Sequence, residues 1–155
     1  MPGKFVYTPQ SGTVLSVGTH TLNTTFTQTN TINYTKASAS VSINVIQKTP
    51  TITWHNPAAL VYGTQLSGTQ LDATALVPGT FVYTPSLETE LDVGLNQTLN
   101  TIFTPIDTAN YTMASANIFI NVKPVTPTIT WSNPTSITYG AALNNTQLDA
   151  TVSVP

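Results

Sequence analysis

The sequence reads PGKFVYTP at residues 2–9 and PGTFVYTP at residues 78–85. A second stretch, TPTITW at residues 49–54, returns unchanged at residues 126–131. The first pair lies 76 residues apart and the second 77, so one residue is inserted between them, and we place it near residues 95–97. A fixed period of this size predicts copies of one small unit in series. It also argues against an enzyme, because a catalytic site seldom needs identical copies.

This period divides the chain into three parts. Residues 47–123 form one complete copy, residues 1–46 match its C-terminal half, and residues 124–155 match its N-terminal half. Three interpretations stay open. The chain is a segment of a longer tandem protein, or it is a subunit whose two halves are completed by neighbouring chains, head to tail. In the third, the boundary is permuted and two intact units fold.

The complete copy reads as β-structure throughout. In the stretch 116–122, Ala116, Ile118, Ile120 and Val122 alternate with polar residues and with Phe119, and residues 39–45 repeat the pattern. Such alternation is typical of a strand with one buried face. Pro or Gly recurs every eight to twelve residues or so, which is typical of an all-β sandwich or barrel. Further strands are expected at residues 52–54, 60–63, 71–75, 81–83 and 99–104, with a turn at Pro78-Gly79 before 81–83.

Composition excludes several classes of function. Only 6% of the residues are charged, and the basic ones are Lys4, Lys36, Lys48 and Lys123. Nucleic-acid binding needs a basic surface, so no nucleic-acid partner is expected. The chain has no Cys and therefore no disulfide framework, and no apolar run is long enough for a membrane span. No secretory signal follows Met1, so a secreted protein would be present here as a mature form or a fragment.

The ordered set of motifs resembles the short bacterial and archaeal immunoglobulin-like surface repeats, the bacterial Ig-like (Big-type) group. The matching stretches are TITW at 51–54, YG at 62–63, QLDATA at 70–75, PGTF at 78–81 and DTANY at 107–111. The resemblance implies tandem immunoglobulin-like β-sandwich repeats of about 76 residues. Such repeats mostly serve as spacers or stalks, and some members bind partners or carbohydrate. The resemblance implies no catalytic residue and no cofactor.

Aromatic residues are the best candidates for the core of so small a unit. A domain of about 75 residues buries little surface, so each large ring matters. The expected structural core residues are Trp54, Tyr83, Phe103, Tyr111 and Trp131.

Titratable residues give little reason to expect a catalytic or metal site. His20 and His55 do not recur in the other copy, as a repeated site would, and both are expected in exposed loops. Glu88, Glu90 and Asp92 form a sparse acidic cluster, for which a solvated strand edge is a better interpretation than a calcium site. We therefore expect no catalytic residue, no metal and no cofactor.

Five Asn-x-Ser/Thr sequences are candidate N-glycosylation sites. A chain this rich in Ser and Thr contains several of them by chance. The candidates are Asn23, Asn33, Asn96, Asn110 and Asn144.

The sequence thus predicts a non-enzymatic structural protein at the cell surface or outside the cell. It would form a stalk, spacer or filament, with copies of itself or neighbouring repeats as partners. The alternative is a surface adhesin or carbohydrate-binding module, with Phe119 as the best outward-facing aromatic residue and a surface glycan as partner.

Overall fold

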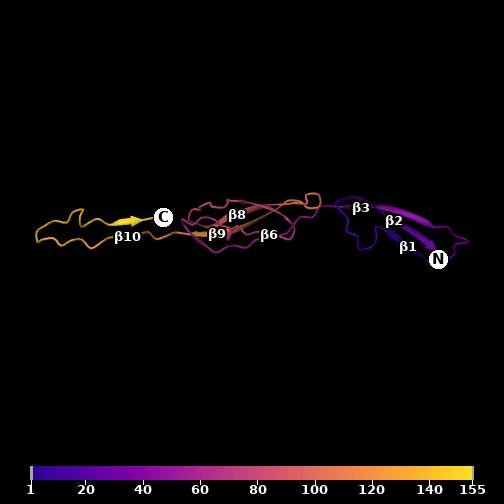
Figure 1. Cartoon of the computed structure of the whole chain (residues 1–155), viewed down its shortest axis with the longest axis horizontal. Coiled ribbons are helices and arrows are strands. Elements are labelled where there is room, and N and C mark those ends of the chain that lie inside the picture. Colours follow the sequence, from indigo (N-terminus) through magenta and orange to yellow (C-terminus); the bar gives the residue numbers. More distant parts are fainter. Residues whose placement is uncertain (1, 155) are drawn as a thin grey trace. The chain divides into compact units, whose positions relative to one another are not determined.

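The computed structural model describes residues 2–154, and these residues contain strands and no helix. The expected all-β class is confirmed, and several sheets give a sandwich-like fold (Figure 1). The strands are β1 (Gly3–Thr8), β2 (Gly18–Gln28), β3 (Ala37–Val45), β4 (Ile52–Thr53), β5 (Leu60–Val61), β6 (Thr74–Ala75), β7 (Gly79–Thr84), β8 (Gly94–Pro105), β9 (Ala114–Lys123), β10 (Thr128–Thr130) and β11 (Thr151–Ser153).

Two compact units divide the chain. The first contains the segment that ends at Thr53, together with Thr74–Val82 and Ile102–Ser115. The second contains Trp54–Ala73, Tyr83–Thr101 and the segment that begins at Ala116.

An antiparallel sheet in the order β1-β2-β3 occupies much of the first unit. Phe5 on β1 lies opposite Phe26 on β2, with their ring centroids 4.7 Å apart. Phe81 and Phe103 in the same unit repeat this pairing, also at 4.7 Å. All six residues of β1 and almost all of β3 are nonetheless exposed. Among residues 2–154, therefore, little covers the side chains of β1 and β3.

A four-stranded sheet follows the order β5-β9-β8-β7. Its strand β9 confirms the predicted alternation, since Ile118, Ile120 and Val122 are buried while Phe119 is 44% exposed. Strand β5 is short, as expected, and pairs with β9 in parallel, Leu60 opposite Val122.

The apolar core of the second unit joins residues from two parts of the sequence. Leu66 and Leu71 come from the segment before β6, and Leu99, Ile118 and Ile120 come from β8 and β9. Trp54, Leu60, Tyr83 and Leu91 pack against this cluster from partly buried positions.

Two further sheets have two strands each, β4-β6 and β10-β11. The strand predicted at residues 71–75 is shorter than expected. Only Thr74 and Ala75 pair, with Thr53 and Ile52 respectively. The preceding residues form a turn instead, with the Leu71 amide donating to the Ser67 carbonyl at 3.0 Å. The carboxamide of Gln70 fixes this turn by accepting from the Ser67 amide, also at 3.0 Å.

Two other local expectations need correction. Gly79 already belongs to β7, because the carbonyl of Pro78 accepts the Ile106 amide and so extends the ladder to this point. His20 lies in β2 rather than in an exposed loop, opposite Ile43 on β3. The sequence places the one-residue insertion between the two copies near residues 95–97. Asn96 in this stretch adopts a φ of 53°, a conformation suited to one extra residue in a strand.

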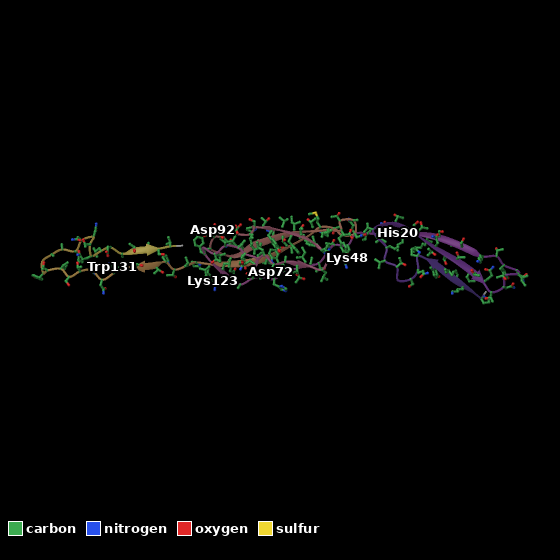
Figure 2. All side chains as sticks on the ribbon, in the orientation of Figure 1. His20, Lys48, Asp72, Asp92, Lys123 and Trp131 are labelled. Carbon is green, nitrogen blue, oxygen red and sulfur yellow. The ribbon has the colours of Figure 1, made fainter. Side chains whose placement is uncertain are left out.

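Figure 2 shows the side chains, with Trp131 labelled just after β10. Trp131 donates its indole hydrogen to the Gln147 carbonyl at 3.0 Å, as Trp54 does to Gln70 at the same distance. The front half of the complete copy and residues 126–154 thus share this local structure.

Candidate functional site

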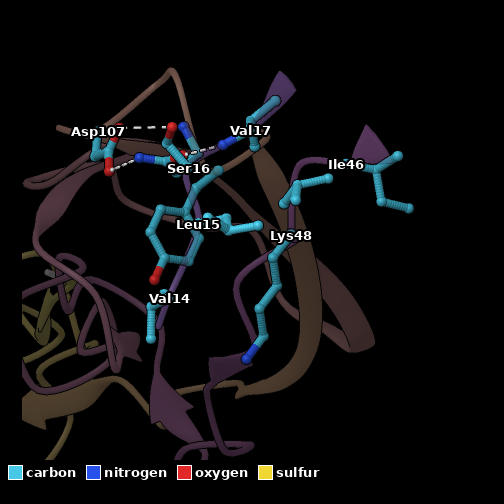
Figure 3. Close-up of a pocket in the computed structure, with 10 residues that line it drawn as sticks. Val14, Leu15, Ser16, Val17, Ile46, Lys48 and Asp107 are labelled. Carbon is cyan, nitrogen blue, oxygen red and sulfur yellow. Dashed lines mark hydrogen bonds between the residues drawn. The ribbon is translucent and has the colours of Figure 1, made fainter. Parts of the chain in front are cut away.

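A surface cavity lies within the first unit, where the connection between β3 and β4 meets the loop that precedes β9 (Figure 3). Three short segments form its walls, one before β2, one after β3 and one in the 107–111 loop. The lining residues are Val14, Leu15, Ser16, Val17, Val45, Ile46, Lys48, Asp107, Asn110 and Tyr111.

Asn110 is the centre of this site. Its carboxamide Oδ1 accepts the main-chain hydrogen of Val17 at 2.8 Å, across 93 residues of sequence. Its Nδ2 donates to a carboxylate oxygen of Asp107 at 2.8 Å, and its main-chain amide donates to the other oxygen at 3.1 Å. Asp107 therefore orients the amide, and the amide binds the neighbouring loop.

The connection after β3 is hydrogen-bonded to the same loop. The Lys48 amide donates to the Asn110 carbonyl at 3.0 Å, and the Thr112 amide donates to the Lys48 carbonyl at 3.1 Å. The carboxamide of Gln47 donates to the Thr108 carbonyl at 2.8 Å, and the hydroxyls of Thr49 and Thr112 lie 2.8 Å apart. Residues 47–49 are thus held along their length by the 107–112 loop.

The electrostatics of the site follow from these bonds. The side chain and the amide of Asn110 stabilise the ionised carboxyl group and hold the pKa of Asp107 below its ordinary value. Figure 3 shows the ammonium end of Lys48 pointing away from Asp107. The hydrogen bonds of Asn110 and Lys48 join the segments that line the site.

The titratable residues that the sequence singled out lie apart from this cavity's lining. His20 directs Nε2 to the Ser16 carbonyl at 2.7 Å, and His55 is exposed in a loop. Glu88 has a φ of 65° and donates its amide to the Leu66 carbonyl, so it turns the chain. Within residues 2–154, no three His, Asp or Glu side chains are grouped to hold a metal ion.

The glycosylation candidates differ in how their amides are used. Asn110 is bonded on both sides, as described above. The Oδ1 of Asn23 accepts the Ser40 hydroxyl at 2.7 Å, and that of Asn144 accepts the Thr146 amide at 2.8 Å. The main-chain amide of Asn96 donates to the Asn121 carboxamide, and that of Asn33 donates to Asn30. Glycosylation of these residues stays a prediction.

The expected core residues lie in three kinds of surroundings. Phe103 is 1% exposed, and Trp54 and Tyr83 meet in an edge-to-face contact with centroids 5.4 Å apart. Tyr111 lines the cavity beside residues 45–48. Trp131 is 57% exposed in the chain as it stands, and its burial in a completed copy stays a prediction.

The sequence did not reveal that Asn110 reaches Val17, or that Gln47 binds the 107–112 loop. A signal was present, because the stretch DTANY at 107–111 is one of the repeated motifs. Its recurrence at residues 30–34, as NTINY, indicated a turn but not the bond to another segment.

Comparison of the chain with protein-family models, with curated proteins and with solved structures gives no match. Among residues 2–154 there is no helix, and hence none with the length and hydropathy to cross a bilayer.

Proposed function

We propose that this chain is a non-enzymatic structural protein that forms an extracellular stalk, spacer or filament from tandem immunoglobulin-like units. The observation that carries the proposal is the hydrogen-bonded connection at residues 47–49. These bonds tie the connection to its own copy and leave little free chain before it, and the Val17–Asn110 bond joins the two consecutive copies. Both features limit bending between copies, which is the property that a spacer needs.

The residues of the connection support this role. Pro50 is buried, and its ring fixes φ at the point where the next copy begins. Lys48 pairs in parallel with Tyr111 of the loop, through its own amide and through the Thr112 amide that its carbonyl accepts. The main chain of the connection is therefore hydrogen-bonded. Gln47 adds a side-chain bond from the preceding residue. A flexible linker would leave these groups to water.

The surface chemistry supports the same role. Threonine, about a fifth of the residues, suits exposed strand positions and supplies hydroxyl groups in place of charge. A chain with so few charged side chains has little electrostatic attraction for nucleic acid or for anionic membranes.

The first test is the location and form of the native protein. Antibodies raised against the chain are expected to label intact source cells, and electron microscopy with the same antibodies is expected to show labelled projections or fibres. Preimmune serum is the control. Labelling that needs permeabilised cells would overturn the extracellular role, and labelling of isolated globular particles would overturn the stalk or filament.

The adhesin alternative has one observation in its favour. Phe119 is 44% exposed on β9, where the other copy has Ser42, so this aromatic residue is not repeated. A glycan array probed with the purified chain separates the two functions. Binding that is lost in Phe119→Ser would favour the adhesin, whereas no binding leaves the structural role.

A further inference from the structure

We propose that residues 48–62 form a strap that carries tension along the chain, through its parallel pairing with residues 111–123. The inference rests on the proposed structural role and adds resistance to stretching to it. It uses only the complete copy, residues 47–123, in which both partners of each contact are present. In a tandem protein under tension, force would enter this copy at residue 47 and leave it at residue 123.

The beginning of the strap is fastened to the loop that precedes β9. Lys48 bridges to Tyr111 in parallel. Its amide donates to the Asn110 carbonyl at 3.0 Å, and its carbonyl accepts the Thr112 amide at 3.1 Å. The hydroxyls of Thr49 and Thr112 lie 2.8 Å apart, across 63 positions of the sequence. Main-chain and side-chain bonds therefore hold this end of the strap together.

The rest of the strap is fastened to β9 itself. Asn56 Oδ1 accepts the Phe119 amide at 3.0 Å, again across 63 positions of the sequence. Leu60 then pairs with Val122 in parallel, and the Tyr62 amide donates to the last residue of β9 at 2.9 Å. The strap thus accompanies β9 to its end, in the register that its first bonds set.

Between these contacts the strap also enters the apolar core. Ile52 and Thr53 leave β9 to pair with β6. Trp54 and Leu60 pack against the buried cluster, and the Trp54 indole donates to the Gln70 carbonyl at 3.0 Å. Sliding of the strap along β9 would therefore pull two apolar side chains out of their packing, in addition to breaking hydrogen bonds.

The directions of the two segments decide how their bonds are loaded. The strap and β9 run parallel, and tension would pull the strap at its first residue and β9 at its last. The two segments are then pulled past each other along their length, so the bonds between them are strained together. A pair pulled apart from one end breaks its bonds one at a time. Breaking several bonds together has the higher barrier, and forced unfolding is governed by the rate of unfolding.

Asn56 is the residue best suited to test the strap. Its side chain is exposed, and its Oδ1 holds a main-chain amide of β9 partway along the pairing. Removing this exposed bond leaves the core residues in place. Asn133 is its counterpart in residues 126–154, is exposed as well, and lies outside the strap and β9.

Single-molecule stretching of the full chain tests the proposal. The chain has no cysteine, so handles can be attached at chosen residues. Ile46→Cys with Val125→Cys places the handles at exposed positions just outside the strap and β9, and loads the pairing along its length. Thr64→Cys with Val125→Cys places both handles near the ends of the strap and β9, and peels the same pairing from there. The force at rupture is expected to be several-fold higher in the first direction.

Asn56→Ala adds a second readout. Between residues 46 and 125 it is expected to raise the rate of unfolding at constant force by about two- to tenfold, because one hydrogen bond that breaks in the transition state is lost. Between residues 64 and 125 the rate should stay unchanged, since peeling begins at the other contacts. Asn133→Ala is the matched control and should change neither rate. Circular dichroism of each variant beside the parent chain checks that the fold is kept.

Two results would overturn the proposal. Equal rupture forces in the two directions would show that the parallel pairing carries no special load. An Asn56→Ala variant that unfolds between residues 46 and 125 at the rate of the parent chain would remove its bond from the strap. Neither result depends on where the native protein is found, so antibody labelling of cells tests the structural role separately.

Discussion

Trp54 donates its indole hydrogen to the main-chain carbonyl of Gln70, and the two atoms lie 3.0 Å apart. Gln70 also accepts the Ser67 amide through its side chain, so one residue fixes both the turn and the ring. Trp54 in turn packs edge to face on Tyr83, which brings the front half of the complete copy against its back half. The same bond between Trp131 and Gln147 lacks such a covering layer, since Trp131 is 57% exposed.

Trp54→Phe is therefore expected to destabilise the complete copy by about 1–3 kcal/mol, because it leaves the Gln70 carbonyl without its donor and removes buried ring surface. Urea unfolding followed by circular dichroism, at dilution, measures the change. Trp131→Phe is the matched control and is expected to shift the free energy of unfolding by less than about 0.5 kcal/mol. Equal losses in the two variants would contradict the difference in burial.

Gly79 has no room for a side chain. A Cβ at this position would overlap the ring of Phe103, which is 1% exposed, and would also meet the main-chain oxygen of Thr104. Gly79→Ala is expected to cost about 1–3 kcal/mol of the free energy of unfolding, the usual range for overpacking a core.

Gly68→Ala is the control for this substitution. A Cβ at residue 68 would meet no atom within 4 Å, so the variant is expected to be neutral or more stable by under about 1 kcal/mol. Thermal unfolding of both variants beside the parent chain decides the matter, and a neutral Gly79→Ala would show that the Phe103 ring can move aside.

Ionisation of Tyr83 is expected to lower the free energy of unfolding at alkaline pH. Burial, with a further contribution from the Asp72 charge, raises the pKa of Tyr83, while a hydrogen bond with the Ala73 main chain opposes the shift. The folded state thus favours the neutral phenol. This contribution is fully present below the ordinary tyrosine pKa of about 10 and is lost as the pH rises through the higher folded-state pKa.

We expect the midpoint of thermal unfolding to fall above about pH 10, and the fall to be smaller in Tyr83→Phe. Tyr7→Phe changes the equivalent residue of the other copy, which is 59% exposed, and is the matched control. Identical profiles for parent chain and Tyr83→Phe would assign the alkaline loss to another group.

The stability of the folded 107–112 loop has the opposite dependence on pH, because Asp107 must stay ionised. Its bonds with Asn110 lower the pKa of Asp107, so its contribution to the folded loop is present above the ordinary aspartate pKa of about 4. The contribution is lost as the pH falls through the lower folded-state pKa. Nuclear magnetic resonance of the Val17 amide should report this loss, because that amide is bonded to Asn110.

Asn110→Ala is expected to return the pKa of Asp107 towards its ordinary value and to free the Val17 amide for exchange with water. Asn33→Ala alters the corresponding loop of the other copy and should leave both readouts unchanged. An unchanged Val17 exchange rate in Asn110→Ala would show that the Asn110 side chain does not protect the Val17 amide.

Much of the β-structure could be predicted because it depends on local alternation. The faces of β9 followed from the sequence, since Ile118, Ile120 and Val122 are spaced by two residues. The stretch at 71–75 was misjudged, because the alternation there competes with a turn that Gln70 fixes through its side chain. The bond from Asn110 to Val17 was out of reach, since it spans 93 residues and neither residue type is distinctive.

The sequence by itself determined the class of fold, the repeat period and the low charge of this protein. These depend on residue order and composition, which a single strand or turn expresses locally. The tertiary structure alone decided which copies of a repeated residue are buried. Ile120 is 1% exposed and its counterpart Ile43 is 42% exposed, although their strands read alike. The physical reason is that burial needs a covering layer, which a strand's own residues do not supply.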